Sequence, residues 1–233
     1  MNTEPEMTSQ ELKTLKRKVI LRFSLFPFLM AAIFLLSAGT FNYWQAYTYI
    51  GILAVPMVCV VSYFMKRNPK FLERRLRMKE KEKPQKFVVF ITTFCFIIGF
   101  LLPGLDIRYA WSNVSVTLVI IADVLVLAGY LFVIYVFREN NYASRIIEVS
   151  EEQKVITTGP YRIVRHPMYL GVLLMYLSTP IALGSWWAVI PFAVVPFIFI
   201  LRILNEEKVL SENLEGYKEY CGKTRYRLFP YIW

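Results

Sequence analysis

The single histidine of this chain, His166, follows Arg165 and precedes Pro167, at the point where a polar segment meets a long apolar one. Proline has no backbone N–H and its fixed φ suits the first helical turn, so the apolar helix is predicted to begin at Pro167. Arg165 and His166 then lie at the helix N-terminus, where free N–H groups and the positive end of the helix dipole attract anions. A guanidinium and an imidazole strengthen such a site. The turn is therefore predicted to bind a carboxylate or a phosphate.

Two acidic residues, Glu206 and Glu207, lie where the last apolar stretch runs without a helix breaker into a polar segment. Glu207 shares one helical face with three apolar residues and a tyrosine, namely Ile203, Leu210, Leu214 and Tyr217. A carboxylate on a face that is otherwise buried favours a partner, which is either Arg165 or the hydroxyl and ammonium groups of a ligand. The plain alternatives are a solvated helix end here and an ordinary interfacial charge at Arg165.

The C-terminal tail from 220 to 230 alternates cations with apolar and aromatic residues. One interpretation is an anchor at a membrane interface, where such side chains are common. The other is a lid that brings Arg225 or Arg227 back over the site at the Arg-His-Pro turn. The pattern alone leaves both open.

The elements that must position these residues are long apolar helices. Of the 233 residues 56% are hydrophobic, and the mean hydropathy is +0.44, which excludes an ordinary soluble domain. A helix needs about 20 residues to cross the hydrocarbon core of a bilayer. Apolar stretches suited to that role fall at 19–38, 44–65, 87–103, 114–137, 167–184 and 185–204. The chain is therefore predicted to be all-α, a polytopic membrane helix bundle with about six spans.

The last two apolar stretches are shorter than the others and are joined only by Gly184 and Ser185. They are predicted to form a C-terminal helical hairpin, in which either segment can be tilted or re-entrant. A cytoplasmic C-terminal helix is expected to follow. The chain divides on this basis into a four-span N-terminal membrane region, 1–137, and a catalytic region, 138–233.

Charge indicates the orientation of the chain. Of the 27 Lys and Arg residues, all but Arg108 fall in segments on one side of the predicted spans. The positive-inside rule therefore predicts that both termini are cytoplasmic, and the expected location is a prokaryotic plasma membrane. The net charge of +10 indicates contact with anionic lipid headgroups and not with nucleic acid.

Three further segments carry weaker signals. The charged loop 66–86 is either a short basic helix on the membrane surface, since Leu72 and Leu76 are four residues apart, or a solvated linker. Residues 138–158 are predicted to be a partly extended cytoplasmic connection. Asp123 lies deep within a span, where a charge is costly, and a buried hydrogen bond to a neighbouring helix is favoured over a role in a substrate tunnel.

No metal site is expected, because the three cysteines and one histidine lack ligand spacing.

The order and spacing of the motifs resemble those of one membrane enzyme family. The motifs are Gly-Pro-Tyr-x3-Arg-His-Pro-Met-Tyr-x-Gly at 159–171, the pair Glu206-Glu207, Gly-Tyr-x2-Tyr at 216–220 and Arg-Tyr-Arg-x2-Pro at 225–230. Together they look like those of the isoprenylcysteine carboxyl methyltransferase and phospholipid methyltransferase family. The resemblance covers roughly 138–233, and the first four spans carry no comparable signature.

The resemblance implies S-adenosylmethionine bound on the cytoplasmic side and a lipophilic acceptor arriving from the bilayer, such as a prenylcysteine-like carboxylate. A carboxylate is ionised at pH 7, so its methylation needs neither a metal nor a strong base. The work lies in aligning the reactants and excluding water.

The resemblance also implies roles for particular residues. His166 and the helix start at Pro167 are assigned to the cofactor carboxylate, and Arg165, with Arg225 or Arg227, to orienting the acceptor. The expected cofactor-binding set is Gly159, Tyr161, His166, Pro167, Tyr169, Glu206 and Glu207, with the two tyrosines as walls and the two acids on the cofactor ammonium or ribose. The expected catalytic set is Arg165, Arg225, Arg227 and Glu207.

Two other functions compete with methyl transfer. An NADPH-dependent membrane sterol reductase also resembles the Arg-His-Pro-x-Tyr-x-Gly turn, but such reductases typically have Asn where this chain has Met168, and an Asp-Glu and a Cys near the position of Glu206-Glu207. A non-enzymatic six-span transporter should show polar or Gly/Pro-broken helices in matching halves. Apart from Asp123 and a few prolines, the predicted spans lack such features. The methyltransferase interpretation fits better.

Overall fold

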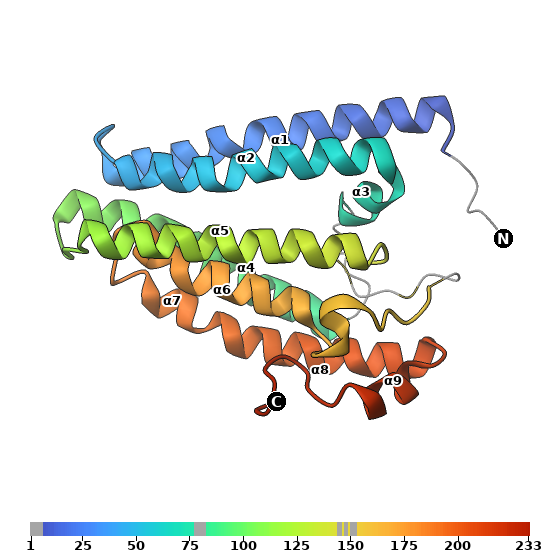
Figure 1. The fold of residues 1–233 in the computed structure, drawn as a ribbon. Helices are drawn as coiled ribbons and strands as arrows, with labels where there is room; N and C mark the ends of the chain where they lie inside the picture. The colour runs from blue at the N-terminus through green and yellow to red at the C-terminus, as the bar shows by residue number, and fades with distance from the viewer. Residues whose placement is uncertain (1–6, 77–82, 144–145, 147–148, 150–152) are drawn as a thin grey trace.

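The computed structural model describes residues 7–76, 83–143, 146, 149 and 153–233, and the regular elements in these ranges are helical (Figure 1). The N-terminal elements are α1 (Ser9–Ala38), α2 (Trp44–Arg67), α3 (Pro69–Leu76), α4 (Lys83–Tyr109) and α5 (Val116–Glu139). The C-terminal ones are the 3₁₀ turn η1 (Gly159–Arg162), α6 (Pro167–Ala182), α7 (Val189–Ala193), α8 (Val195–Asn213) and α9 (Tyr217–Lys223). The all-α prediction is confirmed.

Within the described ranges, five helical segments are long and apolar enough to cross a membrane. They are Ser9–Ala38, Trp44–Arg67, Phe87–Tyr109, Val116–Glu139 and Val189–Asn213. The remaining apolar helix, α6, has only 16 residues, which at a rise of about 1.5 Å each fall short of a bilayer core. The chain is an integral membrane helix bundle. Among the described residues, the six predicted apolar segments correspond to five helical segments of spanning length and the shorter α6.

The predicted C-terminal hairpin is present. α6 begins at Pro167 with His166 as its N-cap, as expected from the proline. The chain reverses at Gly184, whose φ of +76° lies in the left-handed region that glycine tolerates. The returning arm is interrupted at Val194, between α7 and α8, before α8 continues past the apolar region. The same two helices therefore carry the Arg-His-Pro turn and the acid pair.

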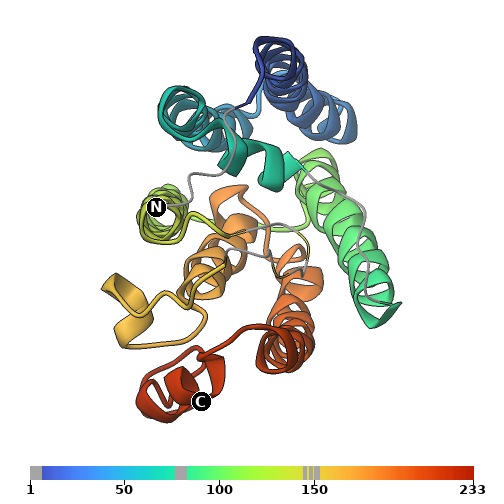
Figure 2. The same ribbon diagram turned by 90° about the vertical axis from the view of Figure 1, so that its right-hand side faces the viewer.

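A close approach of α5 and α6 holds the first arm of the hairpin, α6, against the N-terminal helices. A Cβ on Gly129 would lie 2.7 Å from the carbonyl oxygen of Gly171, and a Cβ on Gly171 would lie 3.0 Å from that of Gly129. Facing glycines let two membrane helices bring their backbones together, as small residues commonly do in bilayers. Figures 1 and 2 both show α5 and α6 side by side.

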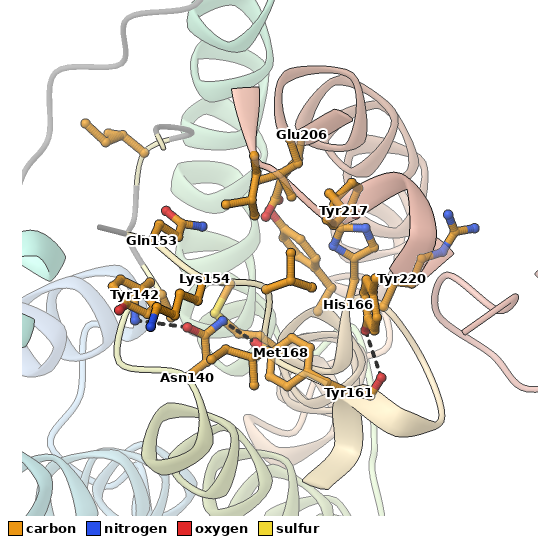
Figure 3. A pocket seen from close by; sticks show the side chains of 18 residues that line it. Asn140, Tyr142, Gln153, Lys154, Tyr161, His166, Met168, Glu206, Tyr217 and Tyr220 are labelled. Carbon is orange, nitrogen blue, oxygen red and sulfur yellow. Dashed lines mark hydrogen bonds between the residues drawn. The ribbon is translucent and has the colours of Figure 1, made fainter. Parts of the chain in front are cut away.

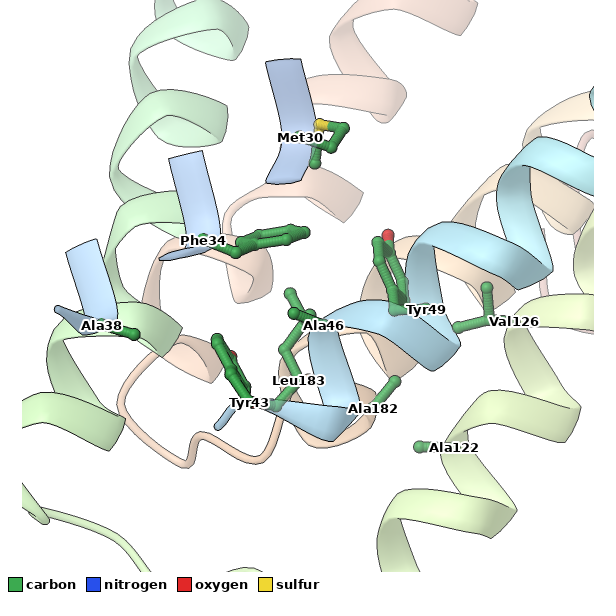
Figure 4. Close-up of a cluster of buried hydrophobic side chains, with 10 residues drawn as sticks. All are labelled: Met30, Phe34, Ala38, Tyr43, Ala46, Tyr49, Ala122, Val126, Ala182 and Leu183. Atoms are coloured by element: carbon green, nitrogen blue, oxygen red, sulfur yellow. The ribbon is translucent and has the colours of Figure 1, made fainter. Parts of the chain in front are cut away.

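A buried cluster joins the N-terminal helices to the hairpin (Figure 4). Phe34, Tyr43 and Tyr49 are almost fully buried there, and the Tyr43 hydroxyl donates to the carbonyl oxygen of Leu183 at 2.7 Å. Asp106, 1% exposed, accepts from the hydroxyls of Ser112 and Ser185. These contacts tie the turns after α4 and α6 together at the end of the bundle opposite the site. Sequence reasoning did not single out Asp106.

Asp123, the acid predicted to lie inside a span, faces the interior of the bundle and is 6% exposed. Its Oδ1 atom has no hydrogen-bond partner in the described part of the chain. The expected bond to a neighbouring helix is therefore not found for that atom.

The loop 66–86 contains α3, so the short-helix interpretation is confirmed for 69–76. Its apolar residues Phe71 and Leu72 are buried against Phe64, Val133 and Phe137, and the placement of the helix on the membrane surface stays a prediction. α3 thus packs against side chains of α2 and α5. The connection predicted at 138–158 is non-helical from Asn140 to Thr158 over its described residues, and positions 144–145, 147–148 and 150–152 lie outside them.

Candidate functional site

The Arg-His-Pro turn is completed by main-chain contacts from the C-terminal tail. Val164 and Tyr226 form an isolated parallel bridge. The backbone N–H of Arg165 donates to the carbonyl oxygen of Tyr226 at 2.9 Å, and that of His166 donates to the carbonyl oxygen of Arg227 at 2.9 Å. The tail therefore returns to the turn, although it anchors the backbone there and does not lie across the cavity.

Glu207 is the charge centre of the site. Its Oε1 lies 3.1 Å from Nη1 of Arg165 and 3.2 Å from Nε2 of His166, and its Oε2 accepts from Nε of Arg227 at 2.8 Å. The Glu207 side chain is 10% exposed. A carboxylate buried to this degree is stabilised only when paired, and here the protein itself supplies the partners. Glu207 is therefore satisfied within the chain.

Glu206 belongs to a separate, more open group. The hydroxyl of Tyr169 donates to its Oε2 at 2.7 Å, and Nε of Arg202 donates to the same hydroxyl at 2.9 Å. Two arms of the hairpin are joined in this way, since Tyr169 lies on α6 and the other two residues on α8. Glu206 is half-buried and keeps carboxylate lone pairs for a further partner.

Tyr161 forms another wall. Its hydroxyl accepts from Nδ2 of Asn140 at 2.9 Å, and its carbonyl oxygen accepts from the hydroxyls of Tyr220 at 2.8 Å and Thr224 at 3.3 Å. Burial raises the pKa of Tyr161 to about 12, outweighing the hydrogen bond from Asn140 and the charge of Arg75, both of which lower it. The phenol is therefore neutral at physiological pH.

These groups surround an open cavity of about 100 Å³ (Figure 3). The predicted residues that line it are Tyr161, Arg165, His166, Tyr169 and Glu206. Two buried polar atoms of lining residues, Nε of Arg165 and the hydroxyl of Tyr217, have no hydrogen-bond partner in the described structure.

Five predicted site residues do not line the cavity, namely Gly159, Pro167, Glu207, Arg225 and Arg227. Gly159 has a φ of +55°, and a Cβ there would lie 2.8 Å from Cδ of Glu139, so it shapes the turn. The side chain of Arg225 is exposed, and its carbonyl oxygen accepts from Nη2 of Arg165 at 3.1 Å. The five residues therefore lie around the cavity without forming its wall.

Sequence reasoning missed four residues of this arrangement as site members: Asn140, Arg202, Tyr217 and Tyr220. Tyr217 carried a usable signal, because it shares a helical face with Glu207. Asn140 and Arg202 carried none, since their partners are distant in the sequence. Within the described residues no group of three or more His, Cys, Asp or Glu side chains is arranged to hold a metal ion.

The site is a polar cavity at one end of an integral membrane helix bundle. Comparisons of the sequence with known proteins show the family to which the chain belongs. The sequence model of the family described as "Phospholipid methyltransferase" matches residues 117–216. The probable protein-S-isoprenylcysteine O-methyltransferase of Oryza sativa subsp. indica is 30% identical over 134 residues, which cover 57% of this chain and 68% of that protein. The chain belongs to the isoprenylcysteine carboxyl methyltransferase and phospholipid methyltransferase family.

Two further relatives define the reach of the similarity. Protein-S-isoprenylcysteine O-methyltransferase B of Arabidopsis thaliana is 33% identical over 131 residues, or 52% of this chain and 61% of that protein. The delta(14)-sterol reductase TM7SF2 of Mus musculus is 29% identical over 90 residues, or 37% of this chain and 22% of that protein. The chain therefore spans about three fifths of the Arabidopsis relative and a small part of the reductase. The family match begins within α5, so the division at 137/138 stays a prediction.

Proposed function

We propose that this chain is an S-adenosylmethionine-dependent methyltransferase whose acceptor is a lipophilic molecule from the bilayer, namely a prenylcysteine-like carboxylate. The observation that carries the proposal is the pair of buried donors, Nε of Arg165 and the hydroxyl of Tyr217, that lack partners at the cavity wall. A buried donor without a partner is costly, so a ligand oxygen that accepts from it stabilises the complex. The names of the rice and Arabidopsis relatives support the reaction class.

The residues present suit this cofactor. S-adenosylmethionine supplies, when bound, a methyl group on a positively charged sulfur. His166 and the first turn of α6 are proposed to bind its carboxylate, and Glu206 its ammonium group or ribose hydroxyls. Tyr161 and Tyr169 are proposed to form apolar walls around it. The half-buried carboxylate of Glu206 and the open cavity support this assignment.

The proposed reaction is an in-line displacement. A carboxylate oxygen of the acceptor forms a bond to the methyl carbon while the carbon–sulfur bond breaks, and the electron pair of that bond stays on sulfur. The protein's task is to align the acceptor and exclude water. Arg165 is proposed to orient the acceptor carboxylate, with Tyr217 beside it. Glu207 and Arg227 are proposed to position Arg165 and His166, because Glu207 contacts Arg165, His166 and Arg227 and does not line the cavity.

A ligand-induced thermal shift tests the proposal. S-adenosylhomocysteine, the product form of the cofactor, is expected to raise the melting temperature of the purified full chain in detergent, because a ligand at 100 times its dissociation constant stabilises a protein by about 2.7 kcal/mol. NADPH at the same concentration is expected to leave the melting temperature unchanged. A shift with NADPH and none with S-adenosylhomocysteine would favour the reductase and contradict the methyltransferase.

We also propose that both termini, and with them the cavity, lie on the cytoplasmic side. The support is the distribution of positive charge, in which only Arg108 falls on the opposite side. Exposed positions for labelling are available at both ends of the bundle: Asn113 on the turn after α4 and Lys223 at the end of α9.

Single cysteines at these two positions are expected to behave differently. In a background with Cys59, Cys95 and Cys221 replaced by serine, Asn113→Cys should react with a membrane-impermeant maleimide in intact cells. Lys223→Cys should react only after the cells are permeabilised. Labelling of Lys223→Cys in intact cells would reverse the proposed orientation.

A further inference from the structure

The short helix α3 lies outside the residues that the family model matches, yet its arginines reach the wall of the cavity. α3 is firmly seated, because Phe71 is 1% exposed and Leu72 is 4% exposed within the cluster shared with Phe64, Val133 and Phe137. The helix follows α2 after a single residue, Asn68, whose side-chain oxygen accepts from the backbone N–H of Phe71 at 3.1 Å. A rigid element of this kind can hold neighbouring side chains in place.

Arg75 contacts the cavity wall through Met168. Its Nη1 lies 4.0 Å from Sδ of Met168, and its Cζ lies 4.6 Å from the ring centre of Phe137. Met168 lines the cavity and is the second residue of α6, directly after the Arg-His-Pro turn. Methionine is flexible and adopts many rotamers unless its surroundings restrict it. The guanidinium contact therefore offers a restraint on a flexible side chain at the cavity wall.

Arg74 contacts the same wall through the turn after α5. Its Nη2 donates to the carbonyl oxygen of Asn141 at 3.1 Å, and its Cζ lies 5.8 Å from the ring centre of Tyr142. Asn140 and Tyr142 line the cavity, and Asn140 binds the hydroxyl of Tyr161. Since this turn is not part of a helix, its position depends on such side-chain contacts.

We propose that α3 is a positioning element of the cavity, in which Arg75 fixes Met168 and Arg74 fixes the turn 140–142. Neither arginine lines the cavity, so each acts through the residue it holds. Preorganisation of a binding wall raises affinity because less ordering is needed when the ligand binds. The inference rests on the proposed function only for the identity of the ligand. The positioning of the cavity wall by α3 does not depend on it.

Arg75→Gln and Arg74→Gln test this role in the purified full chain. Each variant is expected to weaken S-adenosylhomocysteine binding, measured by calorimetry, by about five- to twentyfold, as expected for lost preorganisation. Arg75→Lys should recover part of the loss, because lysine keeps the charge but not the planar group that lies against Phe137. Glu73→Gln, on the exposed face of the same helix, is the matched control and should leave affinity unchanged.

A second measurement does not need the ligand. Hydrogen exchange of peptides covering 139–143 should become faster in Arg74→Gln than in Glu73→Gln, while peptides from α1 remain unchanged. A lower melting temperature with unchanged affinity and unchanged exchange would mean that α3 only stabilises the fold, and would overturn the proposal. If wild-type protein fails to bind S-adenosylhomocysteine, the proposed function fails, and the exchange measurement alone decides whether α3 positions the wall.

Discussion

Replacing Glu207 by glutamine is expected to lower the free energy of unfolding by about 3 kcal/mol, because removing one member of a buried ion pair leaves its partners uncompensated. Two guanidiniums, from Arg165 and Arg227, and the ring of His166 contact this one carboxylate. A neutral amide keeps the shape, but one carboxylate oxygen is replaced by an NH2 group that faces guanidinium donors. Binding of S-adenosylhomocysteine should weaken more than tenfold, since the side chains at the cavity lose their common anchor.

Equilibrium unfolding in mixed detergent micelles and calorimetry measure the two effects. The matched control is Glu212→Gln, which removes the same charge from an exposed position on the same helix. Surface changes of this kind usually alter stability by less than about 0.5 kcal/mol. Equal behaviour of the two variants would contradict the role of Glu207 as the charge centre.

A second large effect is expected from Gly171→Val, at the contact of α5 with α6. A Cβ at this position would already lie 2.8 Å from Cγ2 of Val133 and 3.0 Å from the carbonyl oxygen of Gly129, and valine adds two methyl groups. Overpacking against a backbone should cost about 3 kcal/mol or more in unfolding free energy. Because the first turn of α6 carries His166 and Tyr169, turnover of folded protein should also fall about 100-fold, as for a shift of 1 Å at a reacting centre.

The control for this change is Gly51→Ala on α2. A Cβ at Gly51 would meet no atom within 4 Å, so alanine should be neutral or slightly stabilising, since glycine is the poorer helix former. Unfolding of both variants in the same detergent gives the comparison. Wild-type stability in Gly171→Val would show that the two helices can move apart without loss.

Local signals were sufficient where one residue determines the backbone. Pro167 correctly predicted the start of α6, and Gly184 with its neighbour correctly predicted the hairpin turn. The apolar stretches located the helices, but composition alone could not separate a full span from the 16-residue α6. That helix is bounded by Pro167 at its start and by the turn at Gly184 after its end.

The residues that form the site were predicted better than the contacts between them. The turn and the acid pair do meet, and Arg165 is a partner of Glu207, one of the two alternatives that the sequence left open. The convergence of His166 and Arg227 on the same carboxylate was not predicted, because these contacts join segments far apart in the chain. Glu206 and Glu207 were both expected to bind the cofactor, but their surroundings differ. Glu206 lines the cavity, whereas Glu207 faces other side chains of the protein.

The bridge between Val164 and Tyr226 has a consequence for the order in which the protein matures. The carbonyl groups that anchor Arg165 and His166 belong to Tyr226 and Arg227, beyond the last apolar helix. Synthesis proceeds from the N-terminus, so the helices α1 to α8 leave the ribosome before these two residues do. A nascent chain arrested before Tyr226 can have these helices inserted and still lack its site. Ligand binding should thus appear only once Tyr226 and Arg227 have been synthesised and have reached the turn.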